Sequence, residues 1–190
     1  MWKFIFGLIV TMVSIPVVLQ FIKPYQRDRI VSFLNPESDP LGQGYQLIQS
    51  KIALGSGGAS GKGFLQGTQS YLEYLPEKQT DFIFTLIGEE FGFLGTTFII
   101  LIFILLIAVC YFISIKCFHT FGRILVLGVA SNVFIYVFMN IAMVSGLMPV
   151  VGIPLPLISY GGSVMLSIMI SMGLVLNVEI NYNLKKLNNA

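Results

Sequence analysis

Charged residues are scarce in this sequence, which has 190 residues of which 11% are charged and 55% are hydrophobic. Ordinary soluble domains carry about a quarter charged residues. The net charge is only +2, and the basic residues are scattered, with no run longer than Lys185-Lys186. A protein that binds nucleic acid would need a basic patch or tail, so this composition argues against that class. We therefore expect an integral membrane protein.

Cysteine and histidine are also rare. The two cysteines, Cys110 and Cys117, lie in or at the end of one apolar stretch without metal-ligand partners nearby, and are interpreted as small apolar side chains. His119 is the only histidine of the chain. A histidine metal centre and a Ser/His catalytic triad are therefore both disfavoured.

Long apolar runs, in contrast, are abundant. A helix needs about 20 apolar residues to cross a hydrocarbon core of about 30 Å. Runs of sufficient length occupy residues 2–22, 94–115, 124–150 and 158–178. The first has Lys3 ahead of its apolar core, as signal peptides do, but its length favours a spanning helix. The pattern predicts an all-α polytopic membrane protein, with about four transmembrane helices in a single membrane domain over residues 1–190.

A long polar and glycine-rich connection, residues 23–80, separates the first two predicted spans. Connections of this length are usually functional or disordered. Within it, "YQLIQSKIAL" has apolar residues at Leu47, Ile48, Ile52 and Leu54 with polar residues between them, a spacing that predicts an amphipathic helix at the membrane surface. The short loops and the termini carry most of the unbalanced positive charge, so the positive-inside rule favours cytoplasmic termini and an extracytoplasmic connection.

The segment "LPEKQTDFIFTLIGEE", residues 75–90, leads into the second predicted span and carries the carboxylates of Asp81, Glu89 and Glu90. Thr80 is the predicted N-cap of a helix, and Asp81 in its first turn would be kept ionised by the helix dipole. Asp81 is either a functional carboxylate or simply a favourable residue for starting a helix, and the local sequence does not separate the two.

The same segment is too long for one straight span. Residues 81–115 would extend about 52 Å at about 1.5 Å per residue, so the helix must bend, tilt or project. The candidate break points are Gly88, Gly92 and Gly95. A break there would place Glu89 and Glu90 at the outer interface or beside a wet cavity, where they are candidates for function or for a structural ion pair.

The glycine-rich stretch "GSGGASGKGFLQGTQ", residues 55–69, allows the backbone to approach a ligand closely. Lys62 within it would supply a positive charge suited to a pyrophosphate. The spacing does not match a P-loop, because Ser56 and Gly63 stand where glycine and Ser or Thr are required. The alternative is a flexible solvated turn.

Prolines and paired glycines interrupt the last two spans in "MVSGLMPVVGIPLPLISYGGS", residues 143–163. Irregular backbone at membrane depth is tolerated only where it is buried in protein or lines a cavity. Ser159 and Tyr160, together with Asn140 in the preceding helix, could form hydrogen bonds with a ligand or between helices. Helix packing is the favoured role for Asn132.

Three segments together resemble the SEDS family of shape, elongation, division and sporulation proteins. They are "NPESDPLGQGYQLIQSKIALGSGGASGKGFLQGTQ", "LPEKQTDFIFTLIGEEFGFLG" and "MPVVGIPLPLISYGGS". The lysine in "QSKIA" and the "GTQS" before "LPEKQTDF" favour the RodA-like elongation branch over the division and sporulation branches. The resemblance covers residues 25–178.

The resemblance implies a peptidoglycan glycosyltransferase of the bacterial cytoplasmic membrane that polymerises lipid II on the outer face. The aspartate of its "TDF" motif, Asp81 here, would act as general base toward the acceptor sugar. Lys62 is then the first candidate for contacting the pyrophosphate of the leaving group, with Arg27, Arg29 and Lys51 as weaker candidates. A divalent cation, Mg or Mn, could share this task. Further residues matching family motifs, expected to line the same cavity, are Glu89, Glu90, Ser159 and Tyr160.

Members of this family usually have about ten spans, so the chain corresponds to a carboxy-terminal half. We expect it to work with a separate amino-terminal half and with a class B penicillin-binding protein. Two other readings stay open on the sequence alone. One is a truncated, non-catalytic scaffold in which Asp81 is dispensable, and the other is a transporter of lipid-linked precursors, since broken helices and charged cavities are shared with transporters.

Overall fold

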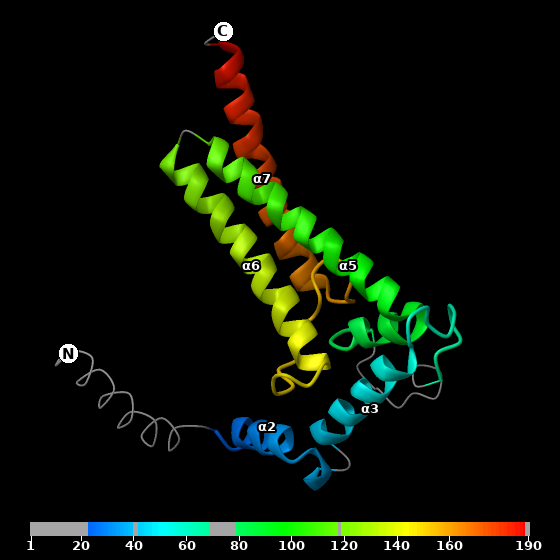
Figure 1. Cartoon of the computed structure of the whole chain (residues 1–190). Helices are drawn as coiled ribbons and strands as arrows, with labels where there is room; N and C mark the ends of the chain where they lie inside the picture. The colour runs from blue at the N-terminus through cyan, green and yellow to red at the C-terminus, as the bar shows by residue number, and fades with distance from the viewer. Residues whose placement is uncertain (1–22, 40–41, 69–78, 118, 189–190) are drawn as a thin grey trace, which may run out of the picture.

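The structure is a computed structural model that describes residues 23–39, 42–68, 79–117 and 119–188. This part of the chain is all-helical (Figure 1). Its elements are α2 (Pro24–Leu34), the short 3-10 helix η1 (Pro36–Ser38), α3 (Gln43–Ser56), α5 (Ile83–Lys116), α6 (Thr120–Val144) and α7 (Gly162–Asn188). The prediction of an all-α polytopic membrane protein is confirmed, because α5, α6 and Gly162–Tyr182 of α7 are each long and apolar enough to cross a membrane. The predicted span at residues 2–22 lies outside the described residues.

The three long helices form a bundle whose two ends differ in character (Figure 1). The short α5–α6 turn and the end of α7 lie at one end, whereas α2 and α3 lie at the other. The apolar core joins Phe103 of α5 to Val133 of α6 and Ile168 of α7, and continues to Leu47 of α3. Because α3 shares this core, the long connection is packed against the bundle over part of its length.

The helix α3 occupies the segment predicted to be amphipathic. Its buried residues are spaced every third position: Gly44, Leu47, Ser50 and Ala53. This spacing places them along one face of the helix. The hydroxyl of Ser50 also donates a hydrogen bond of 3.0 Å to the carbonyl oxygen of Val144, at the end of α6. This face of α3 is therefore packed against the protein, whereas Ile52 is 48% exposed. The predicted location of the helix at a membrane surface stays a prediction.

The helix α5 breaks at one of the three glycines that the sequence offers. Gly92 has φ 67° and ψ −160°, which is the only non-helical conformation inside α5. A Cβ atom at this position would overlap the backbone nitrogen of Gly61. Gly92 is thus required both by its positive φ and by the close approach of the glycine-rich segment.

The connection between α6 and α7 is longer than the sequence predicts. We expected spans over residues 124–150 and 158–178, but α6 ends at Val144 and α7 begins at Gly162. Gly146 has φ 71°, which terminates the helix in the left-handed region. The prolines that follow lack the amide hydrogen needed to continue it. This α6–α7 connection, residues 145–161, forms one wall of the candidate site.

Candidate functional site

Asp81 lies just before α5, and not in its first turn. The helix begins at Ile83, with Phe82 as the N-cap residue, and no acidic residue occupies its first turn. The predictions of Thr80 as N-cap and of Asp81 inside the helix are therefore wrong. The physical reason is tertiary, since the backbone at residues 79–81 is held by groups from the end of α6 and from the α6–α7 connection.

Asn140 provides the first of these groups. Its side-chain amide donates hydrogen bonds of 2.8 Å to the carbonyl oxygen of Asp81 and of 2.7 Å to that of Ile153. The side chain is fully buried. One asparagine therefore ties the backbone of Asp81 to the α6–α7 connection, from a position in the last turns of α6.

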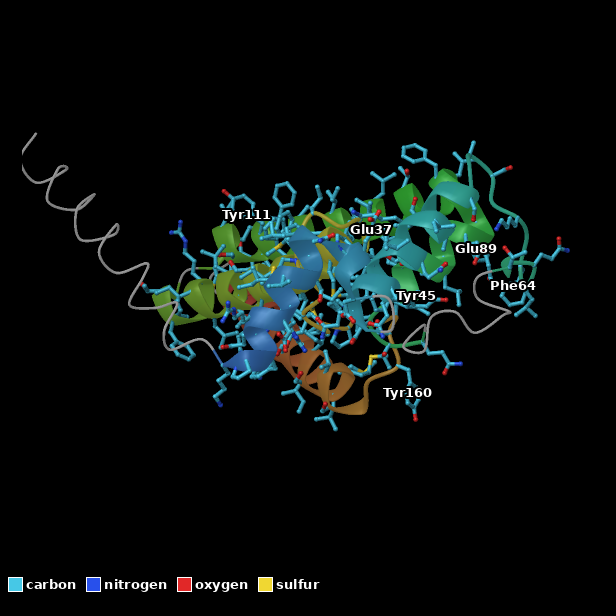
Figure 2. All side chains as sticks on the ribbon, turned by 90° about the horizontal axis from the view of Figure 1, so that it is seen from below. Glu37, Tyr45, Phe64, Glu89, Tyr111 and Tyr160 are labelled. Atoms are coloured by element: carbon cyan, nitrogen blue, oxygen red, sulfur yellow. The ribbon has the colours of Figure 1, made fainter. Side chains whose placement is uncertain are left out.

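Ser159 and Tyr160 hold the two residues that precede Asp81. The hydroxyl of Ser159 donates a 2.7 Å hydrogen bond to the carbonyl oxygen of Thr80 and accepts one of 2.6 Å from the amide of Leu155. The amide of Tyr160 donates a 2.9 Å hydrogen bond to the carbonyl oxygen of Gln79. Three successive carbonyl groups, those of residues 79, 80 and 81, are thus fixed by the facing wall. The Tyr160 side chain itself is 80% exposed and points away from the body (Figure 2).

The carboxylate of Asp81 faces Gly152 of the α6–α7 connection. A Cβ atom at Gly152, whose φ is 78°, would lie 3.0 Å from Oδ2 of Asp81. The amides of Val151 and Gly152 donate to the sulfur of Met143, at 3.3 and 3.4 Å. Gly152 was not singled out from the sequence. The available signal was a glycine among prolines in "VVGIP", at a position where a side chain would crowd the aspartate.

Two basic side chains reach the same connection. The guanidinium group of Arg29 in α2 donates a 2.9 Å hydrogen bond to the carbonyl oxygen of Val151, the residue before Gly152. The side chain of Lys51 in α3 lies against Gly146, where an added Cβ atom would overlap its Cε. Arg29 and Lys51, which the sequence ranked below Lys62, therefore contact the connection whose Gly152 faces Asp81.

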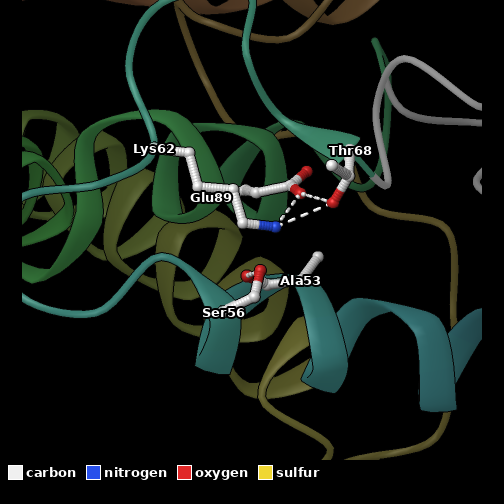
Figure 3. Close-up of polar contacts among 5 residues, drawn as sticks. All are labelled: Ala53, Ser56, Lys62, Thr68 and Glu89. Carbon is white, nitrogen blue, oxygen red and sulfur yellow. Dashed lines mark hydrogen bonds and ion pairs between the residues drawn. The ribbon is translucent and has the colours of Figure 1, made fainter.

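Lys62 lies in a different cluster. Its ammonium group is 2.8 Å from Oε1 of Glu89 and 2.8 Å from the hydroxyl of Thr68, which also donates to Glu89 at 3.2 Å (Figure 3). The Glu89 side chain is completely buried, whereas that of Lys62 is 27% exposed. For Glu89, the structure favours the ion-pair alternative. Lys62 neutralises an internal carboxylate, and its role toward a pyrophosphate stays a prediction.

Backbone hydrogen bonds dock the glycine-rich segment onto the break in α5. The amides of Lys62 and Gly63 donate to the carbonyl oxygens of Glu89 and Glu90, each at 3.0 Å. The amide of Phe93 donates to the carbonyl oxygen of Gly58 at 2.9 Å. Because Gly92 interrupts the helix, these carbonyl and amide groups of α5 are available to a second segment. Glu90 is 3% exposed and belongs to this docking region, about two helical turns beyond Asp81.

Replacement of Lys62 by methionine is expected to destabilise the fold more than it alters a binding site. The change removes the cation that neutralises the buried Glu89 carboxylate, and breaking a buried ion pair by removing one partner costs about 3–5 kcal/mol. Thermal unfolding in detergent measures this loss, with Lys116→Met, at an exposed lysine, as the control. A Lys62→Met protein that unfolds at the wild-type temperature but binds substrate poorly would contradict the structural role and support the pyrophosphate role.

The described ranges contain no cluster of residues suited to bind a metal ion. No group of three or more His, Cys, Asp or Glu residues that could hold a metal ion occurs there. The divalent cation considered from the sequence therefore stays a prediction.

Comparisons with known proteins agree with the motifs. The family model for FtsW, RodA and SpoVE, described as cell cycle protein, matches residues 1–184. The chain is 50% identical over 181 residues to the peptidoglycan glycosyltransferase MrdB of Escherichia coli (strain K12), covering 94% of this chain and 49% of MrdB. It is 41% identical over 161 residues to the peptidoglycan glycosyltransferase RodA of Treponema pallidum (strain Nichols), covering 85% of this chain and 37% of that protein.

The fold is also similar to that of a solved structure, with a TM-score of 0.70 at 35% identity. That structure was reported under the heading of structural coordination of polymerization and crosslinking by a peptidoglycan synthase complex. The match covers 94% of this chain and 48% of the solved chain. The chain thus spans half, or less, of the length of these relatives. With the family model matching nearly all of it, the chain belongs to the FtsW, RodA and SpoVE family of cell cycle proteins, as its three sequence motifs predicted.

Proposed function

We propose that this multi-pass membrane protein is the portion of a peptidoglycan glycosyltransferase that carries its catalytic aspartate, and that it polymerises lipid II during cell elongation. The main support is the convergence on Asp81. Asn140 and Ser159 hold the backbone of Asp81 and Thr80, while the carboxylate faces Gly152. A residue that merely started a helix would need no such arrangement, and Asp81 lies outside the helix.

The proposed role of Asp81 is general base. Its carboxylate accepts the proton of the 4-hydroxyl group of the acceptor sugar as that oxygen attacks the anomeric carbon of the donor. The new glycosidic bond forms while the bond from the anomeric carbon to undecaprenyl pyrophosphate breaks, so the pyrophosphate leaves with the bonding electron pair. General-base assistance of this type contributes about 10² to 10⁴ in rate.

Negative charge on the departing pyrophosphate requires a positive partner. Arg29 and Lys51 are the best-placed basic residues, because both contact the connection that faces Asp81. Among the described residues Arg29 forms no ion pair, so its positive charge is not neutralised there, whereas Lys62 is already paired with Glu89.

Arg29→Met is expected to lower kcat/KM for lipid II about tenfold or more. A hydrogen bond to a charged group contributes about 1.5–3 kcal/mol, and about 1.4 kcal/mol corresponds to tenfold. Methionine keeps an apolar stem of similar length. Arg27→Met is the matched control, since Arg27 is exposed on the same helix. Equal losses in both variants would contradict a specific role for Arg29 and indicate a general effect of positive charge.

The proposed location is the bacterial cytoplasmic membrane, with the Asp81 end of the bundle on the outer face. The short α5–α6 turn at the opposite end is flanked by Lys116 and Arg123, which the positive-inside rule assigns to the cytoplasm. The proposed partners are lipid II, the remaining spans of the fold, and a class B penicillin-binding protein. A solved relative forms a synthase complex that couples polymerization and crosslinking, which supports the last of these.

The function is tested by reconstituting labelled lipid II in liposomes with this chain, the remaining spans and the penicillin-binding protein. Glycan strands separated on gels are expected only when this chain is present. Strands of equal amount and length without it would contradict the enzymatic proposal. Complex formation without any polymerisation would instead favour the scaffold alternative.

A further inference from the structure

The glycine-rich segment exposes two large apolar side chains at its turn. Phe64 is 68% exposed and Leu65 is 72% exposed. Leu65 has φ 61°, a left-handed conformation that non-glycine residues adopt at a cost. Figure 2 shows Phe64 at the periphery of the molecule, beyond the body of the helices. Strained backbone conformations cluster at functional sites, and here the strain presents an apolar side chain outward. This arrangement indicates that Leu65 contacts another surface.

This turn is fixed to the protein on both sides. Before it, the amides of Lys62 and Gly63 are bonded to α5, and the Lys62 side chain is paired with Glu89. After it, the amide of Gln66 donates a 3.1 Å hydrogen bond to the carbonyl oxygen of Gly63, which closes the turn, and Thr68 returns to Glu89. Phe64 and Leu65 are therefore presented in a defined direction.

The apolar surface of the turn is continuous with that of α5. The rings of Phe64 and Phe91 are 6.3 Å apart, and Phe91 lies against Gly95. From there an exposed apolar stripe follows α5 at helical spacing through Leu94, Phe98, Leu101, Leu105 and Phe112. On a membrane-spanning helix, a stripe of large apolar side chains is suited to contact with acyl chains. Phe64 thus extends the stripe beyond the break at Gly92.

The length of α5 places the turn at the edge of the bilayer. Residues 93–116, which follow the break, extend about 36 Å at about 1.5 Å per residue. A hydrocarbon core is about 30 Å thick, which takes about 20 residues, so a span ending near Lys116 reaches the opposite boundary close to Thr97. Phe64 and Leu65, beside Phe91, lie less than two helical turns outside this boundary, at the level of the headgroup layer. Aromatic side chains are enriched at that level of membrane proteins.

We propose that Phe64 and Leu65 insert from the headgroup layer into the boundary with the acyl chains, in the leaflet next to α5, and anchor the glycine-rich segment to lipid. The occupant of this surface is lipid, because the turn continues the apolar stripe of a membrane-spanning helix, its nearest charged pair, Lys62 and Glu89, is neutralised, and Glu90 is only 3% exposed. The anchor fixes the height of the long connection relative to the membrane. It stands on the membrane fold alone and does not depend on the glycosyltransferase proposal.

Tryptophan fluorescence in liposomes tests the insertion. Trp2 is the only tryptophan of the chain, so a Trp2→Phe background allows a single reporter at Phe64→Trp. Because Phe64 is exposed, this exchange leaves the packing unchanged. The full chain is reconstituted in phosphatidylcholine brominated at either shallow or deep acyl positions. We expect lipid bromine to quench most of the emission, with the shallow positions acting more strongly than the deep ones.

Two reporters in the same background calibrate the result. Leu105→Trp, on the stripe of α5 near the middle of the span, is expected to be quenched best by deeper bromines. Tyr160→Trp, which is 80% exposed at the same end of the bundle, is expected to respond to aqueous iodide and little to lipid. A Phe64→Trp reporter that behaves like the one at Tyr160 would overturn the proposal. Protection from both quenchers would overturn it too, since protein would then cover the turn.

Discussion

Asp81→Asn is expected to reduce the rate of lipid II polymerisation by about 10² to 10⁴, the range that general-base assistance contributes. The amide keeps the size and the hydrogen-bonding ability of the side chain but does not accept the proton of the attacking hydroxyl group. The hydrogen bond from Asn140 goes to the backbone of Asp81, so it survives the exchange. Initial rates with labelled lipid II in liposomes, at saturating substrate, measure the loss.

The matched control is Asp28→Asn, at an exposed carboxylate of α2 on the same end of the bundle. Its rate is expected to equal that of the wild type. Thermal unfolding of both variants in detergent should coincide with the wild-type curve, because neither exchange disturbs packing. Polymerisation by Asp81→Asn at the wild-type rate, with glycan strands of normal length, would remove the general-base role. It would also shift weight toward a non-catalytic scaffold.

The sequence predicted the parts of this protein that depend on local patterns. The long apolar runs predicted membrane helices, and α5, α6 and α7 are long and apolar enough to be such helices. Asp81 was selected for its charge at the mouth of an apolar run, and Gly92 was among the three proposed break points. The identity of the break was not predictable, because only the approach of Gly61 from another segment distinguishes Gly92 from its neighbours.

Contacts between distant segments account for what the sequence did not predict. Lys62 ranked first for pyrophosphate because glycines surround it, yet in the fold it neutralises Glu89, which lies far along the chain. Arg29 ranked lower, but its bond to Val151 bridges α2 and the α6–α7 connection. The start of α5 was placed too early for the same reason, since Ser159 and Asn140 hold the backbone that local capping rules assigned to the helix.

Asn140→Ala is expected to lower kcat for lipid II polymerisation about 100-fold while changing the KM much less. The exchange removes the donor that joins the carbonyl groups of Asp81 and Ile153, and so frees the backbone at Asp81, while residues 79 and 80 stay bonded to the α6–α7 connection. A misplacement of a catalytic group by about 1 Å can cost about 10²-fold in rate. Steady-state kinetics over a range of lipid II concentrations separate the two parameters.

A purely structural role for Asn140 would produce a different pattern. Loss of folded protein lowers the apparent kcat in proportion to the folded fraction, and that fraction is measured independently by thermal unfolding. Asn132→Ala is the matched control, because Asn132 lies on the same helix about two turns earlier and is exposed. Its kinetics should equal those of the wild type.

Asn140→Asp sharpens the distinction further. It preserves the shape of the side chain but replaces Nδ2, which donates both hydrogen bonds, by one oxygen. The donor is lost, and this oxygen is repelled by both carbonyl groups. If positioning is the role of Asn140, this isosteric variant should be at least as impaired as Asn140→Ala. A near-normal kcat in Asn140→Asp would mean that filling the space is sufficient. In that case the hydrogen bonds to Asp81 and Ile153 would not be what holds the base in place.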